Sequence, residues 1–364
     1  MSKWNENAIV KEFDPRGKRM IAVSDIHANL PYFKGLLEKV GFSDDDELII
    51  LGDFLERGHC SLATLRYIMD LHRRGNCHVL CGNCDSWCDA LDSERLYWSS
   101  RIVDYMLSKR SGIMWDMLTE MGVEITPDLR FETLIPELGS LYAAEWDFLR
   151  SLPHIIETPR CTFVHGGIKP NIDPRTMRGG DCMKFDHFMD YGYTFDKWVV
   201  VGHWPVMLYL PDHVCANPII DKGHRVVSID GGCSLKDDGQ LNGLIIPPEG
   251  ELGFCAYDPF PVKTVVTPQK GGGKSYYIRW GDNDVQVLRR GKEFSLCRHV
   301  RTGYEMEILT KYLYSDEEFC KCNDSTDLVL ELNAGDKVSI VEETSRGWLV
   351  KHNGTSGWYW GELI

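Results

Sequence analysis

Short apolar segments recur along the chain, and each is followed at once by polar residues. They are Met20-Ile21-Ala22-Val23, Leu48-Ile49-Ile50-Leu51, His78-Val79-Leu80-Cys81, Cys161-Thr162-Phe163-Val164 and Val199-Val200-Val201. Because they are short and mostly aliphatic or β-branched, they predict buried strands of an α/β sheet. Ligands of open α/β sheets gather at the carboxyl ends of the strands. We therefore expect the five strand ends to converge on one crevice.

The stretch from about Ser86 to Leu152 has a different period. Its Leu, Met and Trp residues recur at three- and four-residue spacing, as in Trp115-Asp116-Met117-Leu118-Thr119-Glu120-Met121. This spacing predicts amphipathic helices that form a cap on the core. A role of the cap in substrate choice is the alternative to plain packing.

Past Gly250 the pattern changes to short alternating segments separated by Gly, Asn and Asp, which predicts β structure. From about Leu309 the segments Lys311-Tyr312-Leu313-Tyr314, Gly347-Trp348-Leu349-Val350 and Gly357-Trp358-Tyr359-Trp360 resemble an SH3-type barrel. We therefore predict three segments, namely a catalytic domain over 1–255, a β-rich connector over 256–308 and an SH3-like domain over 309–364.

The SH3-like segment carries a prediction of its own. Domains of this type can present an aromatic groove to an extended peptide. The residues expected on such a groove are Tyr312, Tyr314, Trp348 and Tyr359. A peptide ligand is therefore one expectation for this segment, and a packing role without a ligand is the other.

The polar runs after the five strands carry the candidate chemistry. They are Ser24-Asp25-Ile26-His27, Gly52-Asp53-Phe54-Leu55-Glu56-Arg57-Gly58, Gly82-Asn83-Cys84-Asp85, Val164-His165-Gly166-Gly167 and Gly202-His203-Trp204-Pro205. The candidate metal ligands within them are Asp25, His27, Asp53, Asn83, His165 and His203. Carboxylate, amide and imidazole groups suit hard or borderline cations, and this set is large enough for two ions that share a carboxylate. Singly, each run also fits a turn or a cap.

In this order the runs resemble the metallophosphoesterase (calcineurin-like) superfamily, in its phosphoprotein phosphatase and diadenosine-tetraphosphatase-like branch. The resemblance covers residues 18–250 and extends to Asp147-Phe148-Leu149-Arg150-Ser151-Leu152-Pro153 and Ser228-Ile229-Asp230-Gly231-Gly232-Cys233. It implies a four-layer α/β/β/α sandwich, which the β-rich extension and the small SH3-like β-barrel would follow.

The resemblance also implies how the site works. One metal would lie on Asp25, His27 and Asp53, and a second on Asp53, Asn83, His165 and His203. Manganese is the expected metal, and iron or zinc also fit these ligands. Two such ions can clamp the attacking and leaving oxygens of a phosphate ester and activate a water near neutral pH.

Substrate contacts are implied for two of the runs. Arg57 would bind the substrate phosphate together with Asn83, because a guanidinium meets phosphate oxygens bidentately. A second phosphate-binding cation is expected between the fourth and fifth runs, where Arg175, Arg178 and Lys184 are available. Arg178 is the candidate, and a solvated loop arginine is the alternative.

Two positions depart from the phosphatase pattern, which has Asp in place of Glu56 and His in place of Cys84. In that family the His protonates the leaving alkoxide and the Asp orients it. A thiol, with a pKa of about 8.5, is a weaker acid than imidazolium. Glu56 and Cys84 are therefore candidate catalytic residues with altered roles. The run Gly82-Asn83-Cys84-Asp85-Ser86 also resembles small bacterial phosphodiesterases.

The resulting hypothesis is a dinuclear metal-dependent phosphoesterase that uses a metal-bridging hydroxide. The first prediction is a serine/threonine-phosphatase-like phosphomonoesterase that acts on phosphorylated proteins or small phosphate esters. One alternative is a nucleotide or phosphodiester hydrolase of the diadenosine-tetraphosphatase type. The other is a catalytically weakened binding protein.

Composition narrows the expected partners and location. The net charge of −14 disfavours nucleic acid and anionic membranes as partners. No apolar run approaches the roughly 18 residues of a membrane span, and the polar stretch Met1 to Lys18 is unlike a signal peptide. The 13 cysteines do not form a compact disulfide framework, which fits a reducing compartment. We therefore expect a cytoplasmic protein.

Overall fold

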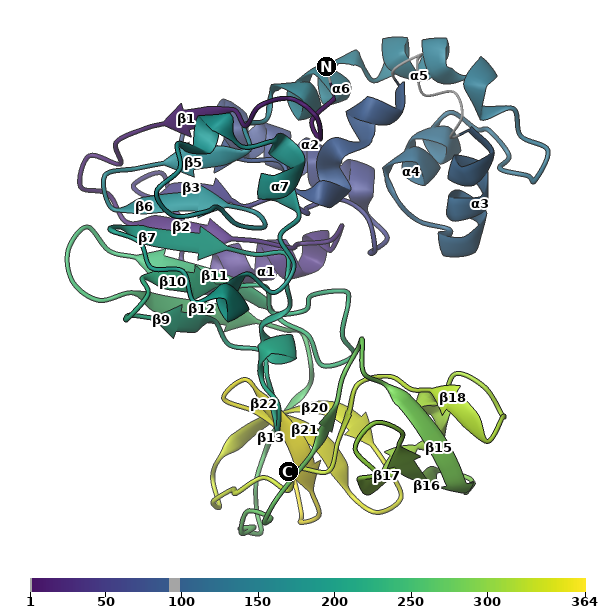
Figure 1. Cartoon of the computed structure of the whole chain (residues 1–364). Coiled ribbons are helices and arrows are strands. Elements are labelled where there is room, and N and C mark those ends of the chain that lie inside the picture. The colour runs from purple at the N-terminus through teal and green to yellow at the C-terminus, as the bar shows by residue number, and fades with distance from the viewer. Residues whose placement is uncertain (1, 92–98) are drawn as a thin grey trace. The chain divides into compact units, whose positions relative to one another are not determined.

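The computed structural model of the protein describes residues 2–91 and 99–364 (Figure 1). The chain forms two compact units that alternate along the sequence. The first unit contains Met1–Pro205, Pro218–Leu235 and Gly239–Asp258, and the second contains Val206–Asn217, Lys236–Asp238 and Pro259–Ile364. The predicted boundaries after residues 255 and 308 stay predictions.

Two packed β-sheets form the centre of the first unit. One sheet has the strand order β12-β11-β2-β3-β4, and the other has the order β1-β5-β6-β7-β10-β9. The strands of the first sheet are β2 (Met20–Val23), β3 (Glu47–Ile50), β4 (Cys77–Val79), β11 (Leu241–Ile246) and β12 (Gly253–Tyr257). The strands of the second sheet are β1 (Val10–Glu12), β5 (Ile155–Glu157), β6 (Cys161–Val164), β7 (Trp198–Val201), β9 (Ile219–Asp221) and β10 (Val226–Ser228). The five predicted strands are confirmed as β2, β3, β4, β6 and β7, and they run parallel within their sheets.

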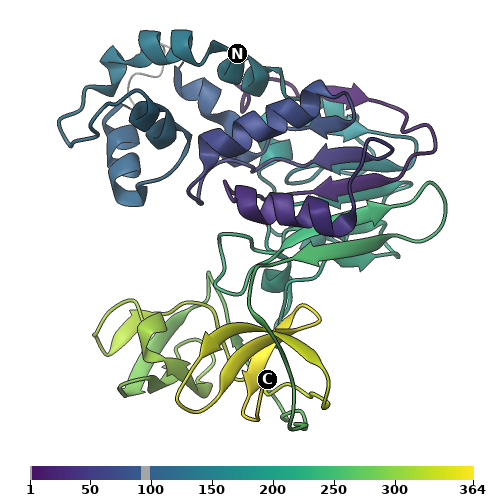
Figure 2. The same cartoon turned by 180° about the vertical axis from the view of Figure 1, so that it is seen from behind.

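Alternating side chains produce the layers of this unit, because successive residues of a strand point to opposite faces. Met20 lies in a buried cluster with Phe163 of the second sheet, whereas its neighbour Ile21 lies in a cluster with Phe33 of the covering helix. The helices on the outer faces are α1 (Leu30–Val40), α2 (Ser61–Arg73) and α7 (Gly179–Met183). Figure 2 shows α1 and α2 side by side over the first sheet. The predicted α/β/β/α sandwich is confirmed.

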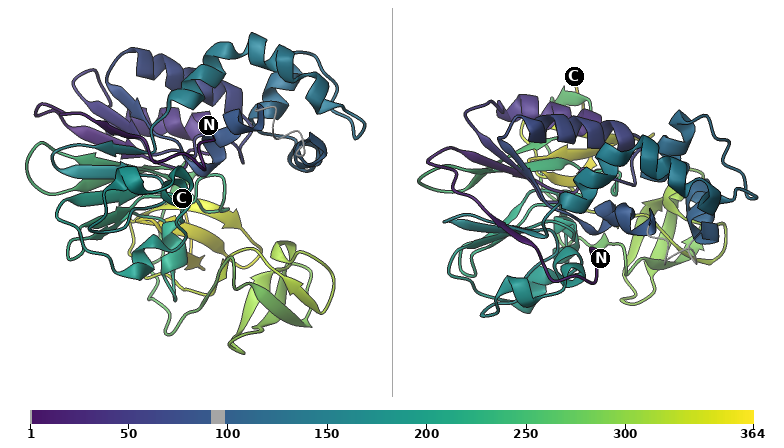
Figure 3. Two further views of the ribbon diagram at one scale, coloured as in Figure 1. Left: turned by 45° about the horizontal axis from the view of Figure 1, so that its top comes forward. Right: turned by 90° about the horizontal axis from the view of Figure 1, so that it is seen from above.

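The predicted helical cap is also confirmed in the part of the chain that the structure describes. Its helices are α3 (Ser99–Lys109), α4 (Ile113–Glu120), α5 (Ile135–Leu141) and α6 (Ala143–Ser151). They gather at one end of the sheets (Figure 3). The N–H of Leu62, at the start of α2, donates to the Asp116 carboxylate over 3.0 Å and joins the cap to the sandwich. The part of this prediction on residues 92–98 lies outside the described residues.

Short 3₁₀ helices complete the helical elements. They are η1 (Asn83–Leu91), η3 (Phe131–Thr133), η4 (Pro174–Thr176), η5 (Phe188–Tyr191), η6 (Val206–Tyr209) and η7 (Thr310–Tyr312). None of the described helices is long and apolar enough to cross a membrane.

The second unit is built from antiparallel strands, which confirms the predicted β-rich extension. Its five-stranded sheet contains β13 (Val262–Thr264), β20 (Lys337–Glu343), β21 (Trp348–His352), β22 (Thr355–Tyr359) and β8 (Val214–Cys215). Its other strands are β14 (Tyr277–Ile278), β15 (Asp284–Arg289), β16 (Phe294–His299), β17 (Glu305–Leu309), β18 (Phe319–Lys321) and β19 (Ser325–Thr326). Tyr359 is fully buried, and its hydroxyl donates to the Thr267 carbonyl, so it lies on no surface groove. The SH3-like barrel and its peptide ligand stay predictions.

Candidate metal centre

The turns that follow the parallel strands bring the predicted ligands of both sheets together. The residues after β2, β3, β4, β6 and β7 include Asp25, Asp53, Asn83, His165 and His203, respectively. The backbone N–H of His203 donates to Asp25 Oδ2 over 2.9 Å. His165 Nδ1 donates to the carbonyl of Leu51 over 2.8 Å. The expected convergence of strand ends on one crevice therefore occurs.

Left-handed backbone is concentrated in these turns. The φ angles are 55° at Asp25, 47° at His27, 49° at Asp53 and 65° at His203. Residues with a Cβ rarely adopt this region, and such conformations cluster at functional sites, where the surrounding structure holds them in place. The local backbone thus aims these side chains at the cost of strain.

Glycines allow the turns to approach one another closely. A Cβ at Gly202 would lie 1.9 Å from Ser24 Oγ and 2.3 Å from Asp25 Oδ2, and a Cβ at Gly82 would lie 2.2 Å from Asp53 Oδ1. No larger residue fits at either position without moving a candidate ligand. This close approach explains why Gly precedes the ligand in both runs.

Two groups of candidate ligand atoms share Asp53. The nitrogen, oxygen and sulfur atoms of His27, Asp53 and Cys84 lie within 4.8 Å of one another, and so do those of Asp53, His165 and His203. A carboxylate can bridge two cations through its two oxygens. The arrangement therefore suits two adjacent ions with Asp53 between them.

The remaining predicted ligands complete the two groups. Asp25 Oδ1 lies 3.7 Å from His27 Nε2. Asn83 Oδ1 and Asp53 Oδ1 each lie 3.3 Å from His165 Nε2. The structure thus brings all six predicted ligands together and adds the sulfur of Cys84.

Unpaired buried atoms fit a bound cation. Asp25 Oδ1, His27 Nδ1 and Asp230 Oδ2 are buried and have no hydrogen-bond partner among the described residues. A buried polar atom without a partner is costly, and metal coordination is one of the few interactions that satisfies it. The donor set therefore fits the divalent ions that the sequence predicts.

The ionisation of these groups reflects burial and close like charges. Burial raises the pKa of Asp25 to about 6 and that of Asp230 to about 8, and the neighbouring carboxylates contribute in the same direction. Although burial opposes the shift, the carboxylates of Asp53 and Asp25 raise the pKa of His165 to about 10. Divalent cations would balance this concentration of buried negative charge.

Three acidic residues of the site were not among the predicted ligands. The Asp85 carboxylate accepts the backbone N–H groups of Asp53 (2.7 Å), Leu55 (3.1 Å) and Gly82 (2.9 Å), so it holds two ligand turns in place. Because Asp85 lies inside the third polar run, the sequence could have identified it as a residue of the site.

The other two acidic residues are Asp186, which contacts a candidate ligand histidine, and Asp230, which lies beside two candidate ligands. His203 Nε2 donates to Asp186 Oδ1 over 2.7 Å, which leaves Nδ1 of that ring for a cation. Asp230 lies close enough to Asp25 and His27 for their charges to shift its pKa, the first upward and the second downward. Asp186 lies in a loop without a motif, so its sequence gave no signal, whereas Asp230 lies in the Ser228–Cys233 run.

Glu56 and Cys84 lie at the site but do not bond to each other. The buried Glu56 accepts the Tyr105 hydroxyl over 2.9 Å and the Ile113 N–H over 2.8 Å, so it connects the turn after β3 to the cap. The backbone N–H of Cys84 donates to Asp53 Oδ1 over 2.7 Å. Burial and the Asp53 carboxylate raise the pKa of the Cys84 thiol.

The two candidate phosphate-binding arginines differ in their surroundings. The charge of the exposed Arg57 acts on His27, Glu56 and Cys84, so it lies beside the candidate ion sites. Arg178 is exposed and forms a backbone bridge with Asn7 at the start of α7. Its role in substrate binding stays a prediction.

Comparisons with known proteins agree with this site. The chain matches the calcineurin-like phosphoesterase family over residues 18–207. It is 28% identical over 189 residues to a symmetrical bis(5'-nucleosyl)-tetraphosphatase of Haemophilus ducreyi, and 29% identical over 189 residues to one of Glaesserella parasuis. Each alignment covers 48% of this chain and 58% of the relative, so the chain spans little more than half the length of these relatives.

A solved structure of a protein serine/threonine phosphatase from Saccharomyces cerevisiae, with similarity to human phosphatase PP5, is 11% identical. It has a TM-score of 0.42, and the match covers 71% of this chain and 86% of that chain. The family match spans more than half of the present chain and includes every ligand-bearing turn described above. The chain therefore belongs to the calcineurin-like phosphoesterase family, whose members are hydrolases that act on phosphate esters.

Proposed function

We propose that this protein is a dinuclear metal-dependent phosphoesterase. The observation that carries the proposal is the place of Asp53 in both groups of candidate ligands. Asp25, His27 and Asp53 would hold one divalent ion, and Asp53, Asn83, His165 and His203 would hold the other. When bound, two such ions supply an activated water and polarise the phosphate ester.

The other residues of the site would bind and orient the substrate. Arg57 presents an exposed guanidinium beside the ligand groups, where it can meet two oxygens of one phosphate. The Asn83 amide oxygen lies near His165, and its amide nitrogen donates one N–H to Cys84 Sγ. The second N–H of that nitrogen would donate to the ester. Both residues act by positioning and by offsetting negative charge.

Cys84 favours substrates whose leaving group needs no proton. Burial and Asp53 raise the pKa of its thiol, so it is a poor acid toward an alkoxide. A departing phosphate, with a pKa of about 6, leaves as an anion at neutral pH. Together with the names of the two bacterial relatives, this supports nucleoside polyphosphates or activated diesters as the substrate class.

A phosphomonoesterase activity is the second candidate. It is supported by the exposed Arg57, which can bind two of the three free oxygens of a terminal phosphate on a phosphorylated protein or a small ester. The predicted exclusion of nucleic acid and membranes as partners stays a prediction.

Manganese is the ion that we propose, with iron and zinc as alternatives, because oxygen and imidazole donors accept all three. We also propose a cytoplasmic location. All 13 cysteines are free thiols in the structure, as expected in a reducing compartment.

The test is turnover by the purified full chain with added Mn²⁺, with and without a chelator. The substrates are an aryl phosphate monoester, a matched aryl diester and a symmetrical dinucleoside tetraphosphate. Chelator-sensitive turnover supports the proposal. The relative turnover rates of the three substrates identify the substrate class. If two ions bind and none of the substrates is hydrolysed, the protein is a binding protein on this fold.

A further inference from the structure

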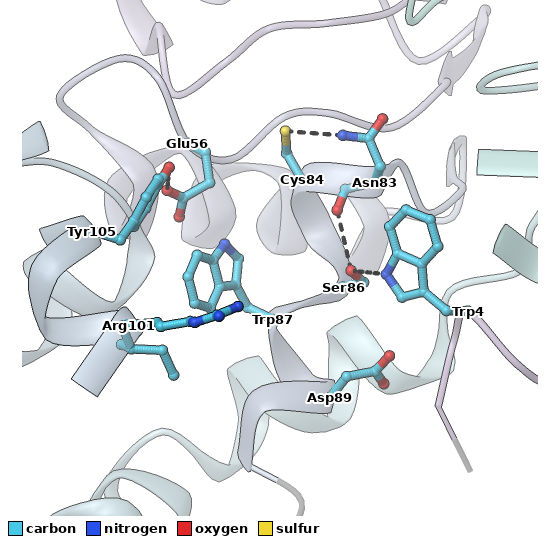
Figure 4. A pocket seen from close by; sticks show the side chains of 10 residues that line it. Trp4, Glu56, Asn83, Cys84, Ser86, Trp87, Asp89, Arg101 and Tyr105 are labelled. Carbon is cyan, nitrogen blue, oxygen red and sulfur yellow. Dashed lines mark hydrogen bonds between the residues drawn. The ribbon is translucent and has the colours of Figure 1, made fainter. Parts of the chain in front are cut away.

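A pocket of about 460 Å³ adjoins the candidate metal centre (Figure 4). Its lining includes Asn83 and Cys84 of the metal-centre turn, together with Trp4, Trp87 and Tyr105. Small-molecule sites in proteins have volumes of roughly 300–1,000 Å³. A substituent of an ester bound at the ions could therefore enter this pocket.

Three aromatic residues, Trp4, Trp87 and Tyr105, contribute to the lining of the pocket. Trp87 and Tyr105 have ring centroids 5.8 Å apart, and Trp4 comes from the N-terminal segment. Figure 4 shows the indoles of Trp4 and Trp87 apart, with Ser86 between them. All three aromatic residues are only half-buried, unlike the fully buried Trp146 of the cap core. Trp4 and Trp87 pack against the buried cluster of the first unit and also line the pocket, so they are anchored and in reach of a bound molecule.

A chain of hydrogen bonds connects the pocket wall to the ligands. Trp4 Nε1 donates to Ser86 Oγ over 2.8 Å, and Ser86 Oγ donates to the Asn83 carbonyl over 3.1 Å. The Asn83 amide nitrogen in turn donates to Cys84 Sγ over 3.3 Å, while its oxygen lies 3.3 Å from His165 Nε2. The orientation of the Trp4 ring is therefore tied to the candidate metal centre.

We propose that this pocket holds a flat aromatic substituent of the substrate while the phosphate lies at the metal centre. Indole faces stack on planar rings, and this contact tolerates different rings because each has a π face. Arg101 and Asp89 also line the pocket, and the Asp89 carboxylate accepts the Ser2 hydroxyl and the Lys3 N–H, which fixes this part of the wall. A nucleobase and an aryl group both present such a planar ring, whereas an aliphatic alcohol, as in phosphoserine, would leave the rings uncovered.

This inference rests on the proposed function, because it places the substrate phosphate at the ion sites. Turnover of adenosine 5′-monophosphate, phenyl phosphate and ribose 5-phosphate by the Mn²⁺-loaded full chain tests it. We expect a lower KM for the first two, and the comparison between them distinguishes a nucleobase from an aryl group. Trp87→Leu should raise the KM of the aromatic esters about tenfold, the magnitude of one stacking contact, and leave that of ribose 5-phosphate unchanged.

Two further variants and a binding measurement make the result decisive. Trp87→Phe keeps an aromatic face and should restore most of the lost affinity, and Trp280→Leu, at an exposed residue of the second unit, should change nothing. Equal KM values for all three esters, unaffected by Trp87→Leu, would overturn the pocket assignment while leaving the phosphoesterase in place. If neither these monoesters nor the aryl diester and the symmetrical dinucleoside tetraphosphate are hydrolysed, the proposed function fails. Calorimetric titration with adenosine 5′-monophosphate and ribose 5-phosphate then tests the pocket assignment independently of turnover. Equal affinities for the two compounds would refute the pocket assignment.

Discussion

Asp53 is the residue on which both candidate ion sites depend. Its carboxylate belongs to both groups of ligand atoms, and it accepts the backbone N–H of Cys84. We expect Asp53→Asn to lose metal binding and to lower kcat/KM by about a thousandfold or more, since bound ions supply several kcal/mol of transition-state stabilisation. Metal content by elemental analysis and turnover of an aryl ester measure the two effects.

A matched control removes a carboxylate elsewhere. Asp45 is exposed, so Asp45→Asn should retain both ions and full activity. Full turnover by Asp53→Asn with two ions still bound would show that the bridging position is wrong.

The acidity of the side chain at position 84 determines whether the site can protonate the leaving group. With its thiol pKa raised by burial, Cys84 offers little acid catalysis, whereas an imidazole ordinarily titrates near neutral pH. We expect Cys84→His to raise kcat on an alkyl phosphate monoester by at least about tenfold, since general acid catalysis contributes roughly 10²–10⁴. Turnover of an activated aryl ester, which needs no proton, is the internal control and should change little. An unchanged alkyl rate would mean that the proton comes from another group.

At the scale of elements, Glu56 couples the turn after β3 to the cap through Tyr105 and Ile113. Burial raises its pKa from 4.5 to about 7. A carboxyl group with a higher pKa in the folded state than in the unfolded state stabilises the fold below the unfolded pKa, and this contribution is lost as the pH rises through the folded pKa. Deprotonating Glu56 between pH 5 and 8 therefore lowers the free energy of unfolding by up to about 3 kcal/mol.

Glu56→Gln isolates this contribution, because glutamine stays neutral at all pH values. The difference in unfolding free energy, variant minus wild type, should grow as the pH rises from 5 to 8, as measured by urea unfolding with a chelator present. Glu124 is exposed, so Glu124→Gln should show no such trend. A constant difference for Glu56→Gln would mean that Glu56 is ionised throughout this range.

The ligand-bearing turns were predictable because their signal is local. Each ligand lies within a few residues of a buried strand, so the sequence contains both the position and the chemistry. The partners of Glu56 were not predictable, since Tyr105 and Ile113 lie some fifty residues away and carry no motif. The same holds for Asp186, which reaches His203 from a separate loop. Long-range contacts of this kind depend on how segments pack, which periodicity does not encode.

At the scale of the whole molecule, the first unit buries several acidic groups that a cation would neutralise. Asp25, Asp53 and Asp230 are each at most 3% exposed. We expect Mn²⁺ to raise the thermal midpoint of this unit, because an ion that binds only the folded state adds about 4 kcal/mol at a thousand times its Kd. Calorimetry with Mn²⁺ and with a chelator measures the shift. An identical midpoint with Mn²⁺ and with the chelator would show that the folded unit does not bind the ions in preference to the unfolded chain.

The alternation of the two units along the chain has a consequence for biosynthesis. β8 (Val214–Cys215) is translated long before β22 (Thr355–Tyr359), with which it pairs. In the first unit, the sheet that contains β2 is complete only after β11 has been translated. The second unit therefore cannot complete its folding before its C-terminal strand is translated, and a single cut cannot separate the two units without leaving part of the second with the first. The growing polypeptide must carry β8 without its partner strand until nearly the end of translation, so we expect removal of the last ten residues to leave β8 unpaired.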